Sequence, residues 1–337
     1  MRKVLITGTA GFIGFHLARL LLEDGFAVTG YDAMTDYYDV QLKHRRHQIL
    51  LQNPHFSCTE GWLEDMATLT RVCDAAEPDI IVHLAGQAGV RYSLENPRSY
   101  IEANIIGTFN VTECARERGV EHLLMASTSS VYGGNTEMPF TEAQKADLPL
   151  TLYAATKRAN EHMGHAYAHL WGIPTTMFRF FTVYGPWGRP DLALFKFVDA
   201  ALKGEAIDVY NHGQMARDFT YVGDLVRGIR LLIDQIPPLP DAREADIPGD
   251  TLSPVAPYRV VNIGNGTKVP LMDFITEIEA ALGLTIKKNL LEMQKGDVHE
   301  TWADNGLLRA LTGYTPQTTL QDGIRDFVAW YRDYYSV

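Results

Sequence analysis

The chain has 337 residues, of which 46% are hydrophobic and 21% charged, so its composition is that of a globular protein and excludes extensive disorder. Its 30 Lys+Arg stand against 41 Asp+Glu, and the formal net charge of -11 argues against nucleic acid or an anionic membrane as partner, because both need a positive surface. Cys58, Cys73 and Cys114 show no CxxC spacing, which predicts neither a metal site nor a disulfide framework and fits a reducing cytoplasm.

Short apolar runs rich in β-branched residues alternate with amphipathic segments from the N-terminus to residue 181. The runs predict strands at 4–7, 27–31, 55–59, 80–84, 122–127 and 175–181. The segments between them predict helices at 12–23, 40–51, 66–76, 97–117 and 152–170. This alternation indicates an α/β fold, a Rossmann-like doubly wound parallel sheet with helices on both faces. The basic run 42–47 in the second helix is predicted to be a solvated helix face.

Beyond residue 181 the alternation ends, and glycine and proline become frequent. The glycines and prolines of 185–190 predict a functional loop, whereas the proline-rich segment 237–258 predicts an exposed insertion or linker. The remaining predicted elements are a strand at 259–263 and helices at 271–282 and 320–334. Glycines interrupt the apolar N-terminal stretch, and no later stretch approaches the ~20 apolar residues of a membrane-spanning helix. We therefore expect a cytoplasmic protein with no membrane partner.

Three glycines follow the first predicted strand in a G-x-x-G-x-x-G spacing. Gly8, Gly11 and Gly14 lie where strand turns into helix. Glycine there lets backbone N–H groups approach a pyrophosphate, and the helix N-terminus supplies partial positive charge. Asp32 ends the second strand, eighteen residues past Gly14, and can accept hydrogen bonds from the hydroxyls of an adenosine ribose. Because Ala33 follows and no arginine stands immediately beside Asp32 for a 2′-phosphate, NAD is favoured over NADP.

A tyrosine and a lysine stand four residues apart at the start of the predicted helix 152–170. This spacing places Tyr153 and Lys157 on one helix face. A neighbouring ammonium and a positive nicotinamide both favour phenolate, which would lower a tyrosine pKa from ~10 toward neutrality and make it a general base. Thr128 lies at the end of the fifth strand, with Ser129 and Ser130 after it. Its hydroxyl is therefore expected to meet Tyr153 and Lys157 over the C-terminal edge of the sheet.

Together these motifs resemble the extended short-chain dehydrogenases/reductases, and among them the UDP-glucuronate 4-epimerases most closely. The matching stretches span nearly the whole chain: GFIGFHLA at 11–18, DYYD at 36–39, HLAGQAGVRYSLENP at 83–97, SSVYGGNT at 129–136, LYAATKRANE at 152–161, RFFTVYGPWGRPD at 179–191, IDVYNHG at 207–213, RDFTYV at 217–222 and GDVHETWAD at 296–304. Three residues depart from the family pattern, in which Asp is usual at Trp62, Asn at Ala33 and Pro at His299.

The resemblance implies the residues of a site. The implied catalytic set is Thr128, Tyr153 and Lys157. The implied cofactor contacts are Gly8, Gly11, Phe12, Ile13, Gly14, Asp32, Leu84, Ala85, Asn104, Tyr153 and Lys157. The implied substrate contacts are Arg91, Ser129, Ser130, Thr182, Arg189, Tyr210, Arg217 and Asp297. In this substrate set Thr182, Arg189 and Arg217 would lie near a diphosphate and Tyr210 would stack on uracil, as the chemistry of arginine forks and aromatic rings permits.

The resemblance further implies NAD-dependent 4-epimerisation of UDP-glucuronate to UDP-galacturonate through a 4-keto intermediate. An NAD-binding Rossmann domain would comprise residues 1–180, about 221–236 and about 259–264. A smaller C-terminal α/β lobe, about 181–220 and about 265–337, would bind the UDP-sugar. The resemblance also implies a homodimer through the helices 97–117 and 152–170.

Other activities stay open at this point. Related decarboxylases and 4,6-dehydratases place an acid in the loop after the Ser/Thr, whereas the stretch from Thr128 to Tyr132 has no carboxyl group. This favours the epimerase over a UDP-glucuronate decarboxylase, while a neutral UDP-hexose 4-epimerase remains an alternative. A non-catalytic NAD-sensing protein is more remote, because the chain carries Thr128, Tyr153 and Lys157 together.

Overall fold

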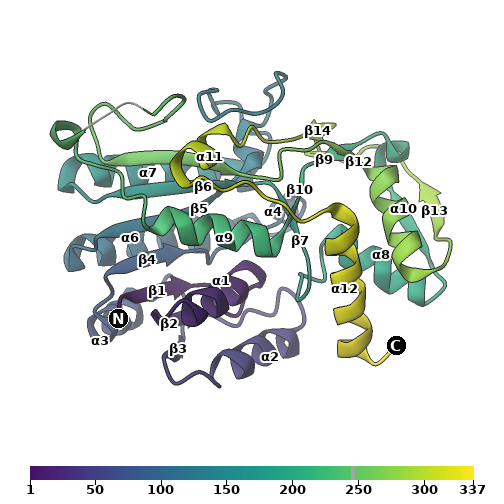
Figure 1. Cartoon of the computed structure of the whole chain (residues 1–337), viewed down its shortest axis with the longest axis horizontal. Helices are drawn as coiled ribbons and strands as arrows, with labels where there is room; N and C mark the ends of the chain where they lie inside the picture. Colours follow the sequence, from purple (N-terminus) through teal and green to yellow (C-terminus); the bar gives the residue numbers. More distant parts are fainter. Residues whose placement is uncertain (244–246) are drawn as a thin grey trace.

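A seven-stranded parallel sheet forms the centre of the protein, in a computed structural model that describes residues 1–243 and 247–337 (Figure 1). The strand order is β11-β6-β5-β4-β1-β2-β3, so the direction of winding reverses between β4 and β1. Every neighbouring pair is parallel, which confirms the predicted doubly wound α/β class. The strands are β1 (Lys3–Thr7), β2 (Ala27–Asp32), β3 (Phe56–Glu60), β4 (Ile80–His83), β5 (His122–Thr128), β6 (Thr175–Phe180) and β11 (Tyr258–Ile263).

Helices cover both faces of this sheet, and their apolar stripes form two cores. The helices on one face are α1 (Phe12–Glu23), α2 (Val40–Leu50), α9 (Val222–Ile233) and α11 (Gly306–Thr312). Phe15 and Leu225 belong to the core on this side. The helices on the other face are α3 (Met66–Ala76), α6 (Gly107–Arg118) and α7 (Leu152–Trp171). Leu69, Val111 and Tyr167 belong to the second core. All seven residues of β5 are buried, as expected for a strand with helices on both sides.

Capping residues explain where two of these helices begin and end. Thr151 accepts the backbone N–H of Ala154 at 3.3 Å at the N-terminus of α7. Gly172 ends the same helix in the left-handed conformation that glycine adopts most readily. Asp39 accepts the N–H of Gln41 at the start of α2. The cap at Thr151 matters for the site, because it fixes the first turn of the helix that carries the predicted tyrosine.

The predicted helix 97–117 is built from three pieces. These are α5 (Pro97–Tyr100), the π-helix η1 (Ile101–Ile106) and α6, and a short helix, α4 (Tyr92–Glu95), precedes them. Single π-turns inside helices often mark functional sites. Here the π-turn carries Asn104, whose side chain reaches the backbone of Gln87 in the loop after β4.

The smaller lobe lies beside the C-terminal edge of the sheet, at the right of Figure 1. Its core is formed by α8 (Ala193–Leu202), α10 (Leu271–Leu282) and α12 (Leu320–Tyr335). Its small sheets comprise β7 (Thr182–Tyr184) with β10 (Phe219–Tyr221), β8 (Ala206–Val209) with β13 (Lys287–Leu290), and β12 (Val269–Pro270), β9 (Ala216–Arg217) and β14 (Glu300–Thr301). The 3-10 turns are η2 (Ser129–Tyr132), η3 (Tyr210–Gly213) and η4 (Pro240–Ala242).

One predicted boundary is wrong: the range 265–337 includes α11, yet Leu308 packs with α9 in the core of the large sheet.

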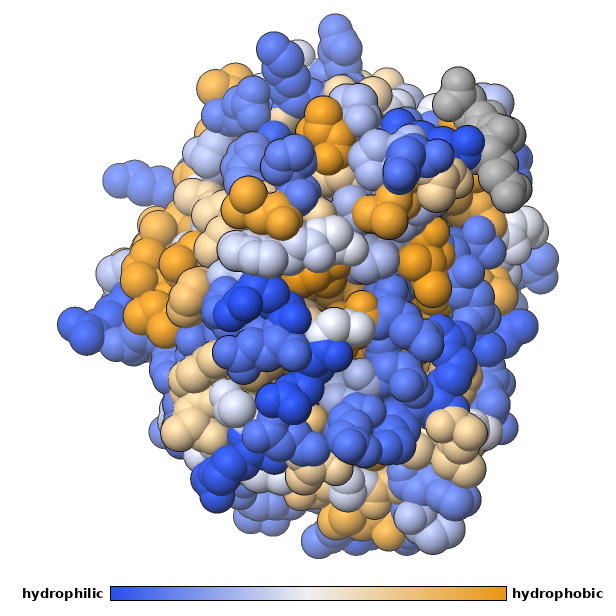
Figure 2. All heavy atoms as spheres, turned by 90° about the vertical axis from the view of Figure 1, so that its left-hand side faces the viewer, coloured by the Kyte–Doolittle hydropathy of each residue, from blue (hydrophilic) through white to orange (hydrophobic). Residues whose placement is uncertain are grey.

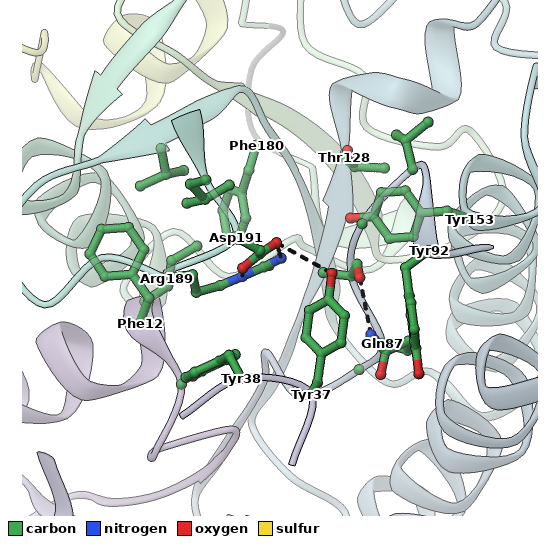
Figure 3. A pocket seen from close by; sticks show the side chains of 18 of the residues that line it. Phe12, Tyr37, Tyr38, Gln87, Tyr92, Thr128, Tyr153, Phe180, Arg189 and Asp191 are labelled. Carbon is green, nitrogen blue, oxygen red and sulfur yellow. Dashed lines mark hydrogen bonds and ion pairs between the residues drawn. The ribbon is translucent and has the colours of Figure 1, made fainter. Parts of the chain in front are cut away.

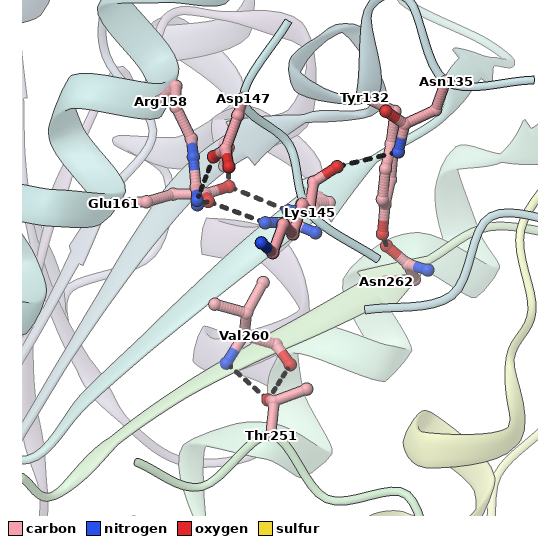
Figure 4. A network of polar contacts seen from close by, with 11 residues as sticks. Tyr132, Asn135, Lys145, Asp147, Arg158, Glu161, Thr251, Val260 and Asn262 are labelled. Carbon is pink, nitrogen blue, oxygen red and sulfur yellow. Dashed lines mark hydrogen bonds and ion pairs between the residues drawn. The ribbon is translucent and has the colours of Figure 1, made fainter. Parts of the chain in front are cut away.

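The proline-rich segment 237–258, whose residues 244–246 lie outside the described residues, is not simply an exposed insertion or linker. Its second half follows the edge strand β11, where Thr251 Oγ1 accepts the N–H of Val260 at 2.9 Å and donates to its carbonyl at 2.6 Å (Figure 4). Ala256 is buried. The high proline content predicted only that the segment lacks regular secondary structure. It did not predict this packing, because a side chain can bond a strand edge from an irregular segment.

The basic run 42–47 also differs from its prediction as a solvated helix face. Lys43 and Arg46 are buried on the side of α2 that faces the glycine turn, whereas His44 and Arg45 are exposed. The two buried cations donate to backbone carbonyl and hydroxyl oxygens, which explains why they tolerate burial.

Figure 2 shows the side of the molecule that lies away from the smaller lobe. Hydrophobic residues form separate patches there among hydrophilic ones. Within residues 1–243 and 247–337, no helix combines the length and the apolar character needed to cross a lipid bilayer.

Candidate active site

A cavity of about 1090 Å³ opens at the C-terminal edge of the parallel sheet, between the sheet and the smaller lobe (Figure 3). The glycine turn after β1 and Asp32 at the end of β2 lie along it, as do Tyr210 of η3 and Arg217 of β9. It adjoins the ends of β1 and β4, where the winding reverses and doubly wound sheets bind nucleotides. Residues of both lobes therefore line the cavity.

The turn after β1 can pack this closely against its neighbours only because its residues are glycines. Gly8 has a φ of +87°, and a Cβ there would lie 2.8 Å from the backbone nitrogen of Ala85. A Cβ on Gly14 would lie 2.0 Å from the carbonyl oxygen of Gly8. These residues thus fit the dinucleotide predicted from the sequence. The predicted cofactor residues that line the cavity are Gly8, Gly11, Phe12, Ile13, Gly14, Asp32, Leu84, Ala85, Tyr153 and Lys157.

Asp32 is oriented by the backbone around it. Its carboxylate accepts the N–H of Ala10 and the N–H of Met34, both at 2.9 Å. Lys43 lies on the same part of the cavity wall and donates to the Thr35 carbonyl at 2.5 Å and to the Thr35 hydroxyl at 2.8 Å. Burial lowers the pKa of Lys43. Sequence reasoning missed Lys43 and Thr35, since only the folded loop brings this part of the basic run to Asp32.

The three predicted catalytic side chains meet at the middle of the cavity. Thr128 ends β5, and Tyr153 and Lys157 lie on the first two turns of α7 (Figure 3). Lys157 Nζ donates to the carbonyl of Ala126 at 3.0 Å, and burial lowers the pKa of Lys157 to about 8. The lysine is therefore anchored to the strand that carries Thr128.

The protein's own groups do not produce the expected lowering of the tyrosine pKa. Burial raises the pKa of Tyr153, while a hydrogen bond with Thr128 and the charge of Arg189 act in the opposite direction. Desolvation of the phenolate outweighs these favourable contacts, and the nicotinamide that was expected to act together with the ammonium is not one of the protein's own groups. Whatever lowers this pKa further must come with the ligands.

Two serines next to Thr128 add further hydroxyl groups to the cavity wall. Thr128 Oγ1 accepts the N–H of Ser130 at 3.2 Å and lies 3.3 Å from its hydroxyl. Ser129 and Ser130 both line the cavity. Ser127, just before them, donates to the buried carboxylate of Glu161 at 2.6 Å and so ties this strand end to α7.

Asn104 is not among the residues that line the cavity, so its contact with the cofactor stays a prediction. Its Nδ2 donates to the Gln87 carbonyl at 3.0 Å and to the Thr156 hydroxyl at 3.1 Å, and its Oδ1 accepts the N–H of Gln87 at 2.8 Å. The side chain is thus used in holding the loop after β4 against α7. Gln87 itself lines the cavity and was missed.

Arg189 lies deep in the cavity, held by a carboxylate. It donates to Asp191 through Nε at 2.9 Å and through Nη2 at 2.5 Å, and Tyr37 donates to the same carboxylate at 3.3 Å. Although burial opposes the charged form, Asp191 raises the pKa of Arg189. Figure 3 shows this group on one side of the cavity, with Thr128 and Tyr153 on the other. The motif DYYD contained Tyr37, but nothing in its spacing indicated this role.

The remaining predicted substrate residues come from the smaller lobe and, in the case of Arg91, from the loop after β4. Arg91 donates to Asp297 at 2.9 Å, and its guanidinium lies 4.5 Å from the ring centroid of Tyr210. Arg217 donates to the carbonyls of Ala216 and His299 through Nη1, and burial lowers the pKa of Arg217. The predicted substrate residues that line the cavity are Arg91, Ser129, Ser130, Thr182, Arg189, Tyr210, Arg217 and Asp297.

The three departures from the family pattern lie around this cavity. Ala33 and Trp62 line it, and the Trp62 indole is 56% exposed while its carbonyl accepts the hydroxyl of Tyr31. His299 holds Arg217 through its backbone carbonyl, so the contact does not depend on the imidazole. None of the three disrupts the residues that bound the cavity.

The glycine turn, the acid after β2 and the Thr-Tyr-Lys group at one sheet edge define the chain as a dinucleotide-dependent enzyme of the doubly wound class. A model of the NAD dependent epimerase/dehydratase family matches residues 4–244, and the chain belongs to this family, which confirms NAD as the expected cofactor.

Relatives and solved structures agree with this placement. A probable UDP-glucuronate 4-epimerase of Rhizobium meliloti is 54% identical over 99% of this chain and 98% of its own length. UDP-glucuronate 4-epimerase 4 of Arabidopsis thaliana is 43% identical over 99% of this chain and 76% of its own. The crystal structure of UDP-glucuronic acid 4-epimerase from Bacillus cereus, in complex with UDP-glucuronic acid and NAD, matches with a TM-score of 0.87 at 30% identity, covering 99% of this chain and 100% of that one.

Proposed function

We propose that this protein interconverts UDP-glucuronate and UDP-galacturonate through a 4-keto intermediate, with the larger lobe holding NAD and the smaller lobe the UDP-sugar. The observation that carries the proposal is the meeting of Thr128, Tyr153 and Lys157 at the sheet edge, facing Arg189 across one cavity. The similarity to proteins named UDP-glucuronate 4-epimerases supports the choice of substrate.

Tyr153, Thr128 and Lys157 each have a separate role in the reaction at the sugar C4. NAD, when bound, supplies the acceptor and donor of the hydride at this carbon. Tyr153 takes the proton of the 4-hydroxyl as general base and later returns it. Thr128 holds the 4-oxygen by a hydrogen bond, and Lys157, held by the Ala126 carbonyl on the same helix face as Tyr153, supplies positive charge to this part of the site. Thr128 and Lys157 are buried and Tyr153 is half-buried, which makes these interactions stronger than they would be in water.

The keto-sugar must then turn over inside the cavity so that its other face receives the hydride. Firm contacts to UDP from Tyr210, Arg217 and Thr182, with fewer contacts to the ring, would permit this rotation. The segment η2 offers hydroxyls and no carboxyl group near C5, so a general acid or base for decarboxylation is missing from it. Ser129 and Ser130 would instead hold the carboxylate in the plane of the ketone.

The test is incubation of the purified protein and NAD with UDP-glucuronate, followed by NMR of the sugar product. UDP-galacturonate supports the proposal. A UDP-pentose would establish the decarboxylase, and turnover of UDP-glucose with similar kcat/KM would establish a neutral UDP-hexose 4-epimerase. No turnover of any UDP-sugar, with NAD bound, would leave the NAD-sensing protein.

We further propose a cytoplasmic homodimer that associates through α7 and the helices from Pro97 to Arg118. Large apolar side chains on these elements are exposed, including Ile101, Phe109 and Trp171. Exposed large apolar side chains on two helices that pack side by side, as α6 and α7 do, are typical of a helical dimer interface. Light scattering at micromolar concentration should give about twice the chain mass, and a monomer would refute the dimer.

A further inference from the structure

A buried arginine outside the cavity joins two of the segments that line it. Arg46 on α2 has no exposed surface. Its Nη1 donates to the carbonyl of Ala10 at 2.6 Å, and its Nη2 donates to the carbonyl of Trp187, also at 2.6 Å. Ala10 lies within the glycine turn, and Trp187 lies two residues before Arg189. One planar guanidinium therefore spans the cofactor turn and the segment 186–191, called here the Arg189 loop.

The third contact of Arg46 leads to Arg189 through the neighbouring tyrosines Tyr38 and Tyr37. Nη1 also donates to the hydroxyl of Tyr38 at 2.8 Å. Tyr38 and its neighbour Tyr37 line the cavity, and Tyr37 donates to the carboxylate of Asp191 that holds Arg189. The three contacts of Arg46 thus go to three cavity-lining segments, while Arg46 itself is not on the cavity wall.

A second attachment fixes the start of the Arg189 loop to α1. His16 bonds the carbonyl of Pro186 through Nε2 at 2.8 Å. Burial lowers the pKa of His16 to about 4, so the ring is neutral at pH 7 and Nε2 must carry the donated proton. The ring of Trp187 packs on Phe15 and on Trp330 of α12, with centroids 5.4 Å apart in both pairs. Trp187 has a φ of +60°, a conformation that a tryptophan keeps only where its surroundings hold it.

Stability alone does not explain a cation at this place. Among the described residues, no carboxylate lies within ion-pair distance of Arg46, and its Nε has no hydrogen-bond partner. A buried guanidinium without a carboxylate contributes little to stability compared with an apolar side chain of the same size. Its planar fork, however, matches two carbonyls on different segments at once, which a lysine ammonium cannot do.

We propose that Arg46 is a positioning residue that fixes the Arg189 loop relative to the cofactor turn, and thereby sets the affinity of the site for the uronate end of the substrate. The inference rests on the proposed function, because it takes a UDP-uronate as the ligand of Arg189. Arg189 faces Thr128 and Tyr153 across the cavity, and its charge acts on Tyr153, which favours a contact with the sugar end over the diphosphate contact that the family resemblance implied. A loop freed from Arg46 would still fold around Trp187, but its arginine would be misplaced with respect to a sugar bound beside the cofactor turn.

The experiment measures binding of UDP-glucuronate and of UDP by calorimetry, in Tyr153→Phe protein saturated with NAD so that no turnover occurs. Arg46→Met should raise the Kd for UDP-glucuronate about tenfold and that for UDP by less than about twofold. Arg46→Lys should fall between, since it keeps one of the two carbonyl contacts. Arg45→Met is the matched control, because Arg45 is the neighbouring, exposed arginine of the same helix, and it should change neither Kd.

A double-mutant cycle separates positioning from a general loss of structure. In an Arg189→Gln background, Arg46→Met should weaken UDP-glucuronate by less than about twofold, because its effect acts through Arg189. Equal factors in both backgrounds, an equal loss for UDP, or an unchanged Kd would each overturn the proposal. If Arg46→Met does not fold, the same cycle with Arg46→Lys decides. Failure of the proposed function is distinct, since unmutated protein would then not convert UDP-glucuronate at all.

Discussion

Glu161 connects three elements beneath the catalytic strand end, and its charge should matter more for stability than any surface carboxylate. Its side chain is 1% exposed and accepts from Arg158 at 2.6 Å (Figure 4). It also accepts from Arg179 at 2.8 and 2.9 Å and from Ser127 at 2.6 Å. Glu161→Gln keeps the shape but removes the charge, which leaves Arg179 buried and uncompensated with 3% of its side chain exposed.

Breaking a buried ion pair in this way costs about 3–5 kcal/mol. We therefore expect Glu161→Gln to lower the free energy of unfolding by about 3 kcal/mol. The control is Glu23→Gln, which breaks an exposed pair with Arg19 at 3.7 Å and should cost about 0.5 kcal/mol or less. Removing both partners, Glu161→Leu with Arg179→Leu, should cost clearly less than the sum of the two single changes, because neither charge is then left alone.

Urea unfolding followed by circular dichroism at one fixed NAD concentration measures these differences, after the contribution of NAD binding is subtracted with the Kd measured for each variant. A Glu161→Gln midpoint within the error of the Glu23→Gln midpoint would refute the reasoning. So would additive losses in the double variant, because the pair would then not be the unit that stabilises this region.

Three other outcomes are expected. Tyr153→Phe should reduce turnover by at least about 10²-fold while UDP binding, measured by calorimetry, stays nearly intact, and wild-type turnover would remove Tyr153 as the base. Gly14→Ala should abolish NAD retention through purification, because its Cβ would lie 2.0 Å from the Gly8 carbonyl oxygen, and normal NAD content would contradict this. Burial lowers the pKa of His122 to about 4, so the stability associated with its neutral form is present above pH ~6.5 and lost as pH falls through 4. The protonation of His122 should therefore lower the free energy of unfolding by about 3 kcal/mol between these pH values. In His122→Gln this loss should be absent, and a variant whose unfolding free energy depends on pH as the unmutated protein's does would contradict the prediction.

Those parts of the fold that depend on local pattern could be predicted from the sequence. The predicted helix 12–23 matches α1 at both ends, and the strands around the glycine turn lie within a residue or two of their predicted positions. The turn itself was predictable because only glycine fits at these three fixed positions. A Cβ at Gly8 or Gly14 would clash with the backbone. Thr128, Tyr153 and Lys157 were brought together correctly, since strand ends and helix starts meet at one sheet edge.

The errors concern side chains whose role depends on tertiary neighbours. Arg46 and Lys43 look like any solvated basic run, and only the folded turn and the Arg189 loop offer the carbonyls that hold them. The hydrogen bonds of the Asn104 amide to Gln87 and Thr156 could not be predicted either, because they depend on the π-turn, and its contact with the cofactor stays a prediction.

The covering of β11 by Thr251 has a consequence for how the protein behaves during synthesis and at high concentration. An outermost strand with free N–H and carbonyl groups is a template on which strands of other molecules can assemble into aggregates. By engaging both polar groups of Val260, Thr251 occupies the place that a foreign strand would take. The proline-rich segment therefore protects the molecule from self-association along this edge, and its prolines, which cannot donate to a ladder, make it a poor template in turn.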